Sequence, residues 1–346
     1  MNEQVFGTNI KYDRRGLSLG LTAYRMLLDH YVKPANYRYN YYYFTGSANS
    51  NIGLDAAYRH NNTIYFGEFS LSANGHKATL VGVDQLLSSG NYVGLHLHHY
   101  DAYYWNLHAS ALSVGGHTRN ESAVTLNTKI KLPLKINAQT ILTYAHYPEM
   151  RSTVYFSSDA FVAHCRLSRH IYKNLQGAVV YRFSSQGHNI KDNNNYSLDQ
   201  ATQHQLQTDL KIRQDEWLYT LRFKHSWYAL SDESSQGSLI YGDIQYEPSN
   251  GPLAASLRLA YFDVDDYDAR LYTSECGLAY DNSGIFYMHR GIRFYAVLHY
   301  QPARRLSLSV KYSISQYLDG TLYGSGNEAL DVSHRQQLRI QMRLLF

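Results

Sequence analysis

Hydrophobic and polar residues alternate along most of the chain, and the clearest example is HRQQLRIQMRLLF at residues 334–346. Every second residue from Leu338 to Phe346 is apolar, and the residues between them are arginine or glutamine apart from Leu345. Successive side chains of a β-strand point to opposite faces, so this segment predicts a strand with one apolar face and one polar face. The apolar face must be covered either by a protein core or by lipid.

The same alternation recurs in about eighteen segments, which we interpret as strands. They lie at residues 5–13, 17–28, 50–60, 63–73, 77–87, 92–99, 120–131, 136–146, 159–169, 174–186, 202–213, 216–229, 237–247, 253–262, 271–280, 291–301, 305–317 and 333–346. Many are about ten to thirteen residues long. Strands of soluble proteins average about five or six residues, whereas a tilted strand that crosses a bilayer needs about nine to eleven. The pattern predicts an all-β fold of long strands.

The predicted connections fall into two classes. Tight turns follow the first, third, fifth, seventh and ninth strands, and turn-forming sequences such as those at 13–16 and 60–62 mark them. Longer connections hold residues 29–49, 100–119, 147–158, 187–201, 263–270 and 318–332. Short turns at one end of a sheet and long loops at the other are typical of outer-membrane β-barrels.

Average composition does not separate a soluble protein from a membrane barrel. The mean hydropathy is −0.43 and the net charge is +4. A transmembrane barrel alternates lipid-facing and interior residues, so its average hydropathy resembles that of a soluble protein. Tyrosine is unusually frequent, with 34 residues against 12 phenylalanines and 3 tryptophans. Its apolar ring and polar hydroxyl suit a membrane–water boundary, although an exposed soluble sheet also accommodates them.

The number of long strands favours the membrane. A soluble barrel of about eighteen strands would enclose a wide apolar interior, whereas side chains fill the interior of only about eight strands. We therefore predict one antiparallel transmembrane β-barrel of about 14–18 strands, even in number, in a bacterial outer membrane. It spans residues 1–346 as a single domain. The first and last predicted strands are expected to pair, because an unpaired edge in lipid leaves backbone groups without partners.

Several segments carry a resemblance to a known family: residues 66–82, 97–112 with the following 120–121, 259–275, 290–313 and the C-terminal end. The most specific is YFDVDDYDARLY at 261–272. From about residue 50 onward the chain resembles the C-terminal barrel of Bacteroides-group outer-membrane proteins that carry an N-terminal helix-hairpin-helix region. The resemblance implies an exported barrel and helical hairpins like those of competence-type DNA-binding proteins. This sequence lacks such hairpins, so we expect an N-terminally truncated chain and a weakened case for DNA binding.

Polar residues on the predicted strands are expected to line the barrel interior. The candidates are Glu68, His96, His98, Arg222, Arg258, Lys311, Arg339 and Arg343. Asp84 and Glu121 are expected to join them in ion pairs. His96 and His98 share one face, and two such imidazoles bind a metal when a neighbouring strand supplies a third ligand. The sequence identifies no third ligand, so we predict polar lining residues and no metal or other cofactor.

The segment FDVDDYDAR predicts an acidic cluster of Asp263, Asp265, Asp266 and Asp268 at the rim of the barrel. Calcium is an alternative occupant, because hard cations take several carboxylate oxygens. The spacing differs from that of a twelve-residue calcium loop, and Arg270 is available to pair with a carboxylate. A charged, structured rim loop is the prediction. The terminal Phe346 resembles the insertion signal of bacterial outer-membrane barrels.

We expect an integral outer-membrane protein without enzymatic activity: a channel, a plugged pore or a scaffold for uptake of a polymer such as DNA. Its expected partners are outer-membrane lipid and the barrel-assembly machinery, with DNA or another polymer only by family analogy. Tyrosine-rich loops such as YRYNYYYF at 37–44 are expected to fold over or into the interior. Two alternatives stay open, an outer-membrane lipid hydrolase and a soluble large β-sheet binding protein. A hydrolase needs a serine, a histidine and a carboxylate or amide on adjacent strands, and no motif here identifies a nucleophile.

Overall fold

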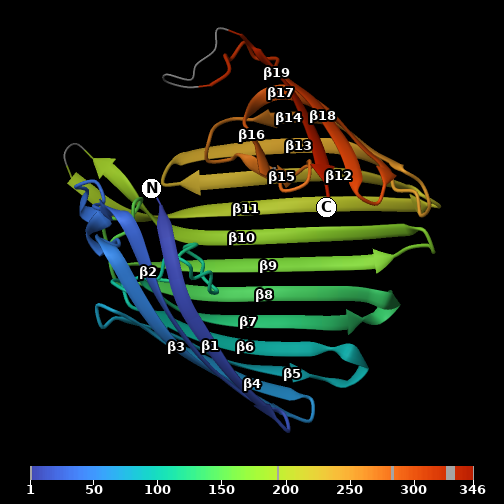
Figure 1. Ribbon diagram of the computed structural model, residues 1–346. Coiled ribbons are helices and arrows are strands. Elements are labelled where there is room, and N and C mark those ends of the chain that lie inside the picture. Colours follow the sequence, from blue (N-terminus) through green and yellow to red (C-terminus); the bar gives the residue numbers. More distant parts are fainter. Residues whose placement is uncertain (1, 193–194, 282–283, 325–331, 346) are drawn as a thin grey trace. The chain divides into compact units, whose positions relative to one another are not determined.

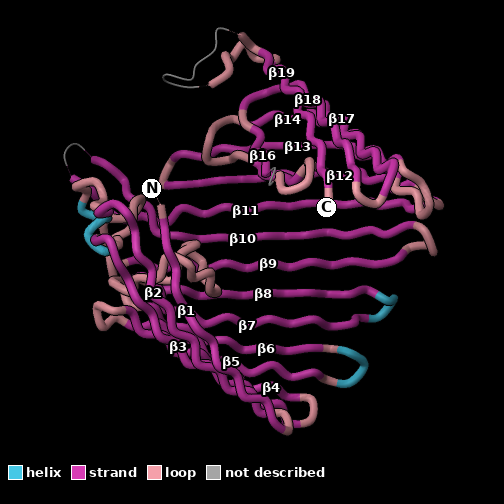
Figure 2. Tube along the Cα trace, in the orientation of Figure 1, coloured by secondary structure: helices cyan, strands magenta, loops and turns pink. Residues whose placement is uncertain are grey.

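The computed structural model describes residues 2–192, 195–281, 284–324 and 332–345. They form nineteen β-strands and three short 3-10 segments (Figure 1). The elements are β1(Glu3–Arg14), β2(Leu17–Val32), η1(Arg38–Tyr42), β3(Gly46–His60), β4(Thr63–Ser72), β5(Lys77–Leu86), η2(Ser88–Gly90), β6(Tyr92–Tyr100), β7(Glu121–Leu132), η3(Pro133–Lys135), β8(Ile136–Tyr147), β9(Ser158–His170), β10(Leu175–Asp192), β11(Asn195–Gln214), β12(Trp217–Leu230), β13(Glu233–Tyr246), β14(Leu253–Val264), β15(Leu271–Ser274), β16(Gly284–Tyr287), β17(His289–Ala303), β18(Leu306–Tyr317) and β19(His334–Leu344). Figure 2 shows how little of the chain is helical. No helix in these ranges has the length and apolar character needed to cross a membrane.

Seventeen strands belong to one large sheet, and β15 and β16 form a separate two-stranded sheet. The strand pairs run antiparallel, as the registers of β1 with β2 and of β18 with β19 illustrate. The chain divides into two compact units. The first unit holds residues 1–133, 137–165 and 183–202, and the second holds 134–136, 166–182 and 203–346.

Two expectations about strand number need correction. The segment 271–280 was predicted as a full strand, but only Leu271–Ser274 is extended, and it pairs with β16 outside the large sheet. Its alternation has another cause, because Leu271 and Thr273 are buried in the second unit while Tyr272 is exposed. The large sheet therefore has seventeen strands among the described residues. This number lies within the predicted range, but the expected even number is wrong for this part of the chain.

The turns that follow β1, β3, β5, β7 and β9 are short, as predicted. Between β1 and β2 the chain turns on Arg15 and Gly16, whose φ angles are 48° and 85°. Two consecutive positive φ angles are typical of a tight hairpin turn. A side chain at Gly16 would also meet the Arg59 carbonyl oxygen, because a Cβ there would lie 2.7 Å from it. Glycine is therefore required at this turn.

The long connections of each unit share one end of its strands. In the first unit they join β2 to β3, β6 to β7 and β8 to β9, and in the second they join β14 to β17 and β18 to β19. The predicted loop at 187–201 is wrong, because β10 continues to Asp192 and β11 begins at Asn195. Polar residues on both faces hid these strand extensions from a search for apolar alternation.

Side-chain exposure is inverted relative to a soluble sheet in both units. On β6, Leu95 and Leu97 are 42% and 46% exposed, whereas His98 is 5% exposed. On β18, Leu308 is 37% exposed and Lys311 only 5%. The apolar residues thus face outward and the polar residues are covered. This arrangement is typical of transmembrane β-barrels, so the predicted fold class, all-β and antiparallel, is confirmed.

Candidate functional site

In the first unit, the connection between β6 and β7 folds back onto the polar face of the strands. We call residues 101–120 the first docked loop. The Trp105 carbonyl accepts hydrogen bonds from Asn49 Nδ2 at 2.6 Å and Asn51 Nδ2 at 3.0 Å on β3. The Tyr104 hydroxyl donates to Ser70 Oγ on β4 at 2.7 Å. Backbone and side-chain groups of the loop therefore bind the polar faces of two neighbouring strands.

Glu121, at the start of β7, holds the other end of the first docked loop. Its side chain is fully buried, and its carboxylate accepts hydrogen bonds from the N–H groups of Val114 and Gly115, both at 2.8 Å. Ser113 Oγ donates at 2.8 Å, and His98 Nε2 lies 2.9 Å away. Four groups thus converge on one carboxylate, and hydrogen bonds to an ionised acceptor are stronger than those between neutral groups.

The tyrosine-rich connection between β2 and β3 packs onto the first docked loop. Trp105 Nε1 donates to the Tyr42 carbonyl at 3.2 Å, and the Trp105 ring meets Phe44 edge-on at a centroid distance of 5.5 Å. Arg119 lies 3.4 Å above the centre of the Tyr43 ring. These contacts link two loops at the same end of the first unit, and such aromatic pairs add stability beyond the area that they bury.

A cavity of about 240 Å³ lies among these loops. Two guanidinium groups contribute to it, Arg119 above Tyr43 and Arg151 3.6 Å above Tyr147. Burial lowers the pKa of both arginines from the usual value, and Arg151 Nε is buried without a hydrogen-bond partner. Desolvated guanidinium groups and aromatic rings are suited to a small anion.

In the second unit, the connection between β14 and β17 crosses the polar face in the same way. We call residues 265–281 the second docked loop; Figure 1 shows its β15 lying against β12 and β13. Its central residue, Glu275, has a fully buried carboxylate. Arg293 on β17 donates to both carboxylate oxygens at 2.7 and 3.0 Å, and Lys311 on β18 lies 3.1 Å away. This loop is therefore held by charge.

Further contacts continue along the second docked loop from strand to strand. They are Gln203 Nε2 to the Asp268 carbonyl at 3.3 Å, Lys224 Nζ to the Tyr272 carbonyl at 3.1 Å, Arg258 Nη1 to the Ser274 carbonyl at 2.9 Å, and Arg339 Nη1 to Asp281 Oδ2 at 2.6 Å. The donors lie on β11, β12, β14 and β19, so the loop spans most strands of the second unit. A solute would have to displace it to reach that part of the polar face.

The structure places the predicted interior residues in several different settings. His98 contacts the first docked loop through Glu121, and Arg258, Lys311 and Arg339 contact the second. His96 Nε2 lies 2.8 Å from Asp84, and Arg222 pairs with Asp209 at 2.5 and 3.1 Å. Glu68 lines a cavity of about 280 Å³ beneath the first docked loop. Arg343 lies opposite Ser307 in the β18–β19 register. Glu275, the buried anion of the second docked loop, was not among the residues predicted from the sequence.

The four aspartates of the predicted acidic cluster do not converge. Asp263 pairs with Arg290 at 3.1 Å, Asp265 accepts the Gln236 N–H at 3.0 Å, and Asp266 accepts the N–H of Asp268 at 2.9 Å. No group of three potential metal-binding side chains occurs in the ranges that the structure describes. Arg270 donates to the Tyr267 carbonyl and the Tyr272 hydroxyl. Phe346, the predicted insertion signal, lies outside the described residues.

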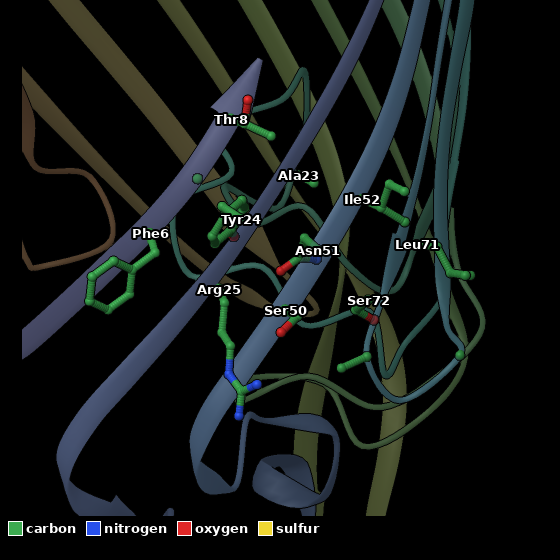
Figure 3. A pocket seen from close by; sticks show the side chains of 13 residues that line it. Phe6, Thr8, Ala23, Tyr24, Arg25, Ser50, Asn51, Ile52, Leu71 and Ser72 are labelled. Carbon is green, nitrogen blue, oxygen red and sulfur yellow. The ribbon is translucent and has the colours of Figure 1, made fainter. Parts of the chain in front are cut away.

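A groove runs over the outward face of β1–β4 in the first unit (Figure 3). The pairs Phe6–Arg25, Arg25–Ser50 and Ile52–Leu71 of the strand registers form its floor. Its lining is largely apolar, and Arg25 adds a cation near the loop end. An arginine beside apolar side chains is suited to a lipid headgroup, because its stem packs on apolar groups while its charge reaches polar surroundings.

Comparison with known proteins gives no family. No family model and no curated protein matches the chain. Among solved structures, in-vitro folded OmpT, an outer membrane protein of Vibrio cholerae, is 11% identical with a TM-score of 0.46, covering 96% of this chain and 99% of that one. Its loop L8 deletion mutant gives 11% and 0.44, with 98% and 99% covered. NanC porin is 14% identical with a TM-score of 0.25, covering 78% and 94%. These low similarities transfer no role to this chain.

Proposed function

We propose that the protein is an integral outer-membrane β-barrel whose polar interior is closed by the two docked loops. The inverted exposure carries this proposal. Leu257 and Leu259 on β14 are 42% and 62% exposed, while their neighbour Arg258 is 5% exposed. Outward apolar side chains gain free energy when lipid covers them, at about 25 cal/mol per Å² of apolar surface. In water the same surface would promote aggregation.

Exposed aromatic residues near the short turns support a membrane boundary there. Trp217 begins β12 and Tyr300 lies near the end of β17, and both are 42% exposed. In the first unit, Tyr58 and Tyr65 flank the turn between β3 and β4 and are 45% and 52% exposed. Aromatic side chains are enriched at both interfaces of transmembrane barrels, where the ring contacts lipid and the polar group contacts water.

The docked loops support a closed interior rather than an open pore. Their contacts use buried charged groups such as Glu121 and Glu275, and the release of either loop would break hydrogen bonds or ion pairs of those groups. Uptake of a polymer, the role that the family resemblance implies, would require both loops to leave the polar face. The docked state therefore corresponds to a resting state on this proposal.

Membrane fractionation of native cells tests the location, and migration before and after heating tests the fold. A folded barrel is expected in the detergent-extracted outer-membrane fraction, with a heat-dependent change in migration on a gel. Recovery in the soluble fraction would favour the soluble β-sheet alternative.

Planar-bilayer recording tests the closed interior. We expect little conductance from the intact protein, and large stable conductance steps would contradict closure by the loops.

A further inference from the structure

Polar residues lie among the apolar residues of the outward face near the loop end of β6 and β7 in the first unit. His99 and Ser122 are direct neighbours in the register of these strands. His99 Nδ1 lies 2.7 Å from Ser122 Oγ, and His99 Nε2 lies 3.1 Å from Asp101 Oδ1. A hydroxyl, an imidazole and a carboxylate thus form a continuous hydrogen-bonded series, which is the arrangement that activates a serine nucleophile.

The carboxylate of this series is fixed by its own contacts. Asp101 Oδ2 accepts the Lys77 N–H at 2.9 Å, and His76 Nδ1 lies 3.5 Å away. Partial burial opposes ionisation, but hydrogen bonds from Lys77 and His99 hold the pKa of Asp101 below its usual value. An ionised Asp101 keeps the proton of His99 on Nε2. The Nδ1 atom that faces Ser122 is then free to accept a proton.

A second histidine lies in the same groove as Ser122 and His99. The hydroxyls of Thr125 and Thr143 are 3.1 Å apart on the inward face of β7 and β8. His146 on β8 lines the same outward groove as Ser122. His146 Nδ1 lies 2.8 Å from Asp159 Oδ1, so this imidazole also has a carboxylate partner. His146 is therefore placed to contact a substrate that binds in the same groove.

The series borders an apolar groove of about 380 Å³. Leu97 and Val124 lie two residues further from the loop end along their strands, share the groove with His99 and Ser122, and are 46% and 37% exposed. In a membrane barrel this depth is the boundary between polar headgroups and acyl chains. The ester bonds of a lipid lie at the same boundary. An acyl chain along the groove would therefore bring its ester carbonyl to the level of Ser122.

A bland explanation is that polar residues simply gather where strands leave the membrane. The second unit provides a comparison, because His225 Nδ1 lies 2.7 Å from Ser238 Oγ across β12 and β13. Among the described contacts of His225, no carboxylate hydrogen-bonds to its ring. A cross-strand serine–histidine pair therefore forms without catalytic equipment, whereas the pair in the first unit also has an anchored aspartate and an apolar groove.

We propose that Ser122, His99 and Asp101 form a catalytic triad that transfers the acyl group of a membrane-lipid ester to water. Ser122 Oγ attacks the ester carbonyl while His99 Nδ1 takes the hydroxyl proton. The C–O bond to the lipid alcohol breaks, and His99 returns the proton to that alcohol, which leaves an acyl group on Ser122. Water then attacks the acyl-serine with His99 as the base, and a fatty acid leaves. The proposal rests on the membrane location proposed above, because lipid must reach the outward face.

The test uses the full chain folded in phospholipid vesicles, with a fluorophosphonate probe and release of fatty acid as two readouts. The probe is expected to label Ser122, as peptide mass spectrometry would show, and fatty acid is expected to accumulate. In Ser122→Ala, labelling at this peptide should vanish and hydrolysis should fall by roughly 10³-fold or more. Ser238→Ala is the matched control and should retain full labelling and hydrolysis.

Asp101→Asn separates catalysis from general stability, since Asp101 is a positioning residue. Its kcat should fall roughly 10³-fold or more with KM little changed, and Asp101→Glu should recover part of the rate. Heat-dependent gel migration confirms that each variant is folded in the membrane, so failure of the barrel proposal is distinguished from failure of the triad. Folded wild-type protein without label or hydrolysis would overturn the triad. Equal activity in folded Ser122→Ala would overturn it as well.

Discussion

The two docked loops cover the polar faces of their units by different means. In the first unit the buried carboxylate belongs to the strand wall, and the loop presents neutral donors to it, namely the N–H groups of Val114 and Gly115. In the second unit the buried carboxylate belongs to the loop, and the wall presents the cations Arg293 and Lys311. Loss of the carboxylate therefore leaves N–H dipoles without an acceptor in the first unit, and leaves full positive charges without a counter-charge in the second. The second loop should be the more sensitive to any change of charge.

The substitution Glu275→Gln should have the largest effect. It leaves Arg293 and Lys311 covered without a counter-charge, and breaking a buried ion pair in this way costs about 3–5 kcal/mol. We expect the second docked loop to leave the wall, so that the half-buried Cys276 reacts faster with a maleimide in a Cys165→Ser background. The opened interior should conduct anions better than cations, because the wall cations are then unpaired.

Glu233→Gln is the control for this substitution, because Glu233 lies exposed at the start of β13. It should change the free energy of unfolding by less than about 0.5 kcal/mol and leave the rate of Cys276 labelling at the wild-type value. Equal Cys276 labelling in wild type and Glu275→Gln would contradict the charge-based account of the second loop.

Glu121→Gln should have a smaller effect in the first unit. The amide keeps one acceptor oxygen, but its NH₂ group points at loop donors, and unsatisfied buried groups of this kind cost about 1–3 kcal/mol. Hydrogen exchange at the amides of Val114 and Gly115 should accelerate while exchange in the second docked loop stays constant. A loss as large as that of Glu275→Gln would remove the distinction between the two loops.

The strands of both units were predictable because their physical cause is local. Alternation along a segment such as residues 305–317 requires only that one face meets apolar and the other polar surroundings. All seventeen strands of the large sheet correspond to predicted segments, with β10 and β11 extended beyond them. The docked loops were not predictable from the same signal. Glu275 contacts Arg293 and Lys311 only because a loop returns over strands that follow it in the chain.

Polar residues at positions where the alternation calls for an apolar residue are a signal in the sequence, and two residues of the proposed triad show it. In LHLHHY the apolar positions Leu95 and Leu97 are followed by His99, and Ser122 occupies the corresponding parity before Val124 and Leu126. A polar residue at an apolar position marks a place where the outward face meets something other than an acyl chain. That two such exceptions are cross-strand neighbours depends on register, which a single sequence leaves open.

Acid should weaken the second docked loop through Glu275. Burial alone would raise the pKa of this carboxyl, but Arg293 and Lys311 hold it below the usual 4.5. The stabilisation that Glu275 provides is therefore complete above pH 4.5 and is lost as the pH falls through the lowered pKa. Exchange at the amides of Cys276 and Ala279, corrected for intrinsic rates, should accelerate below about pH 4. Glu275→Gln should show no such change.

His117 should make the first docked loop respond at a higher pH, with the smallest effect of the four. Burial, followed by the nearby Arg119, lowers the pKa of His117 below its usual 6.5. As the pH falls from 6.5, the released loop takes up a proton more readily than the docked loop, so docking weakens until the lowered pKa is passed. In a Trp217→Phe, Trp227→Phe background, Trp105 is the sole tryptophan and its fluorescence reports this loop. A shift between pH 7 and 5.5 that His117→Gln abolishes is expected. The effect is small because His117 is only partly covered, so water still solvates its charge in the docked state. A shift that persists in His117→Gln would assign the response to another group.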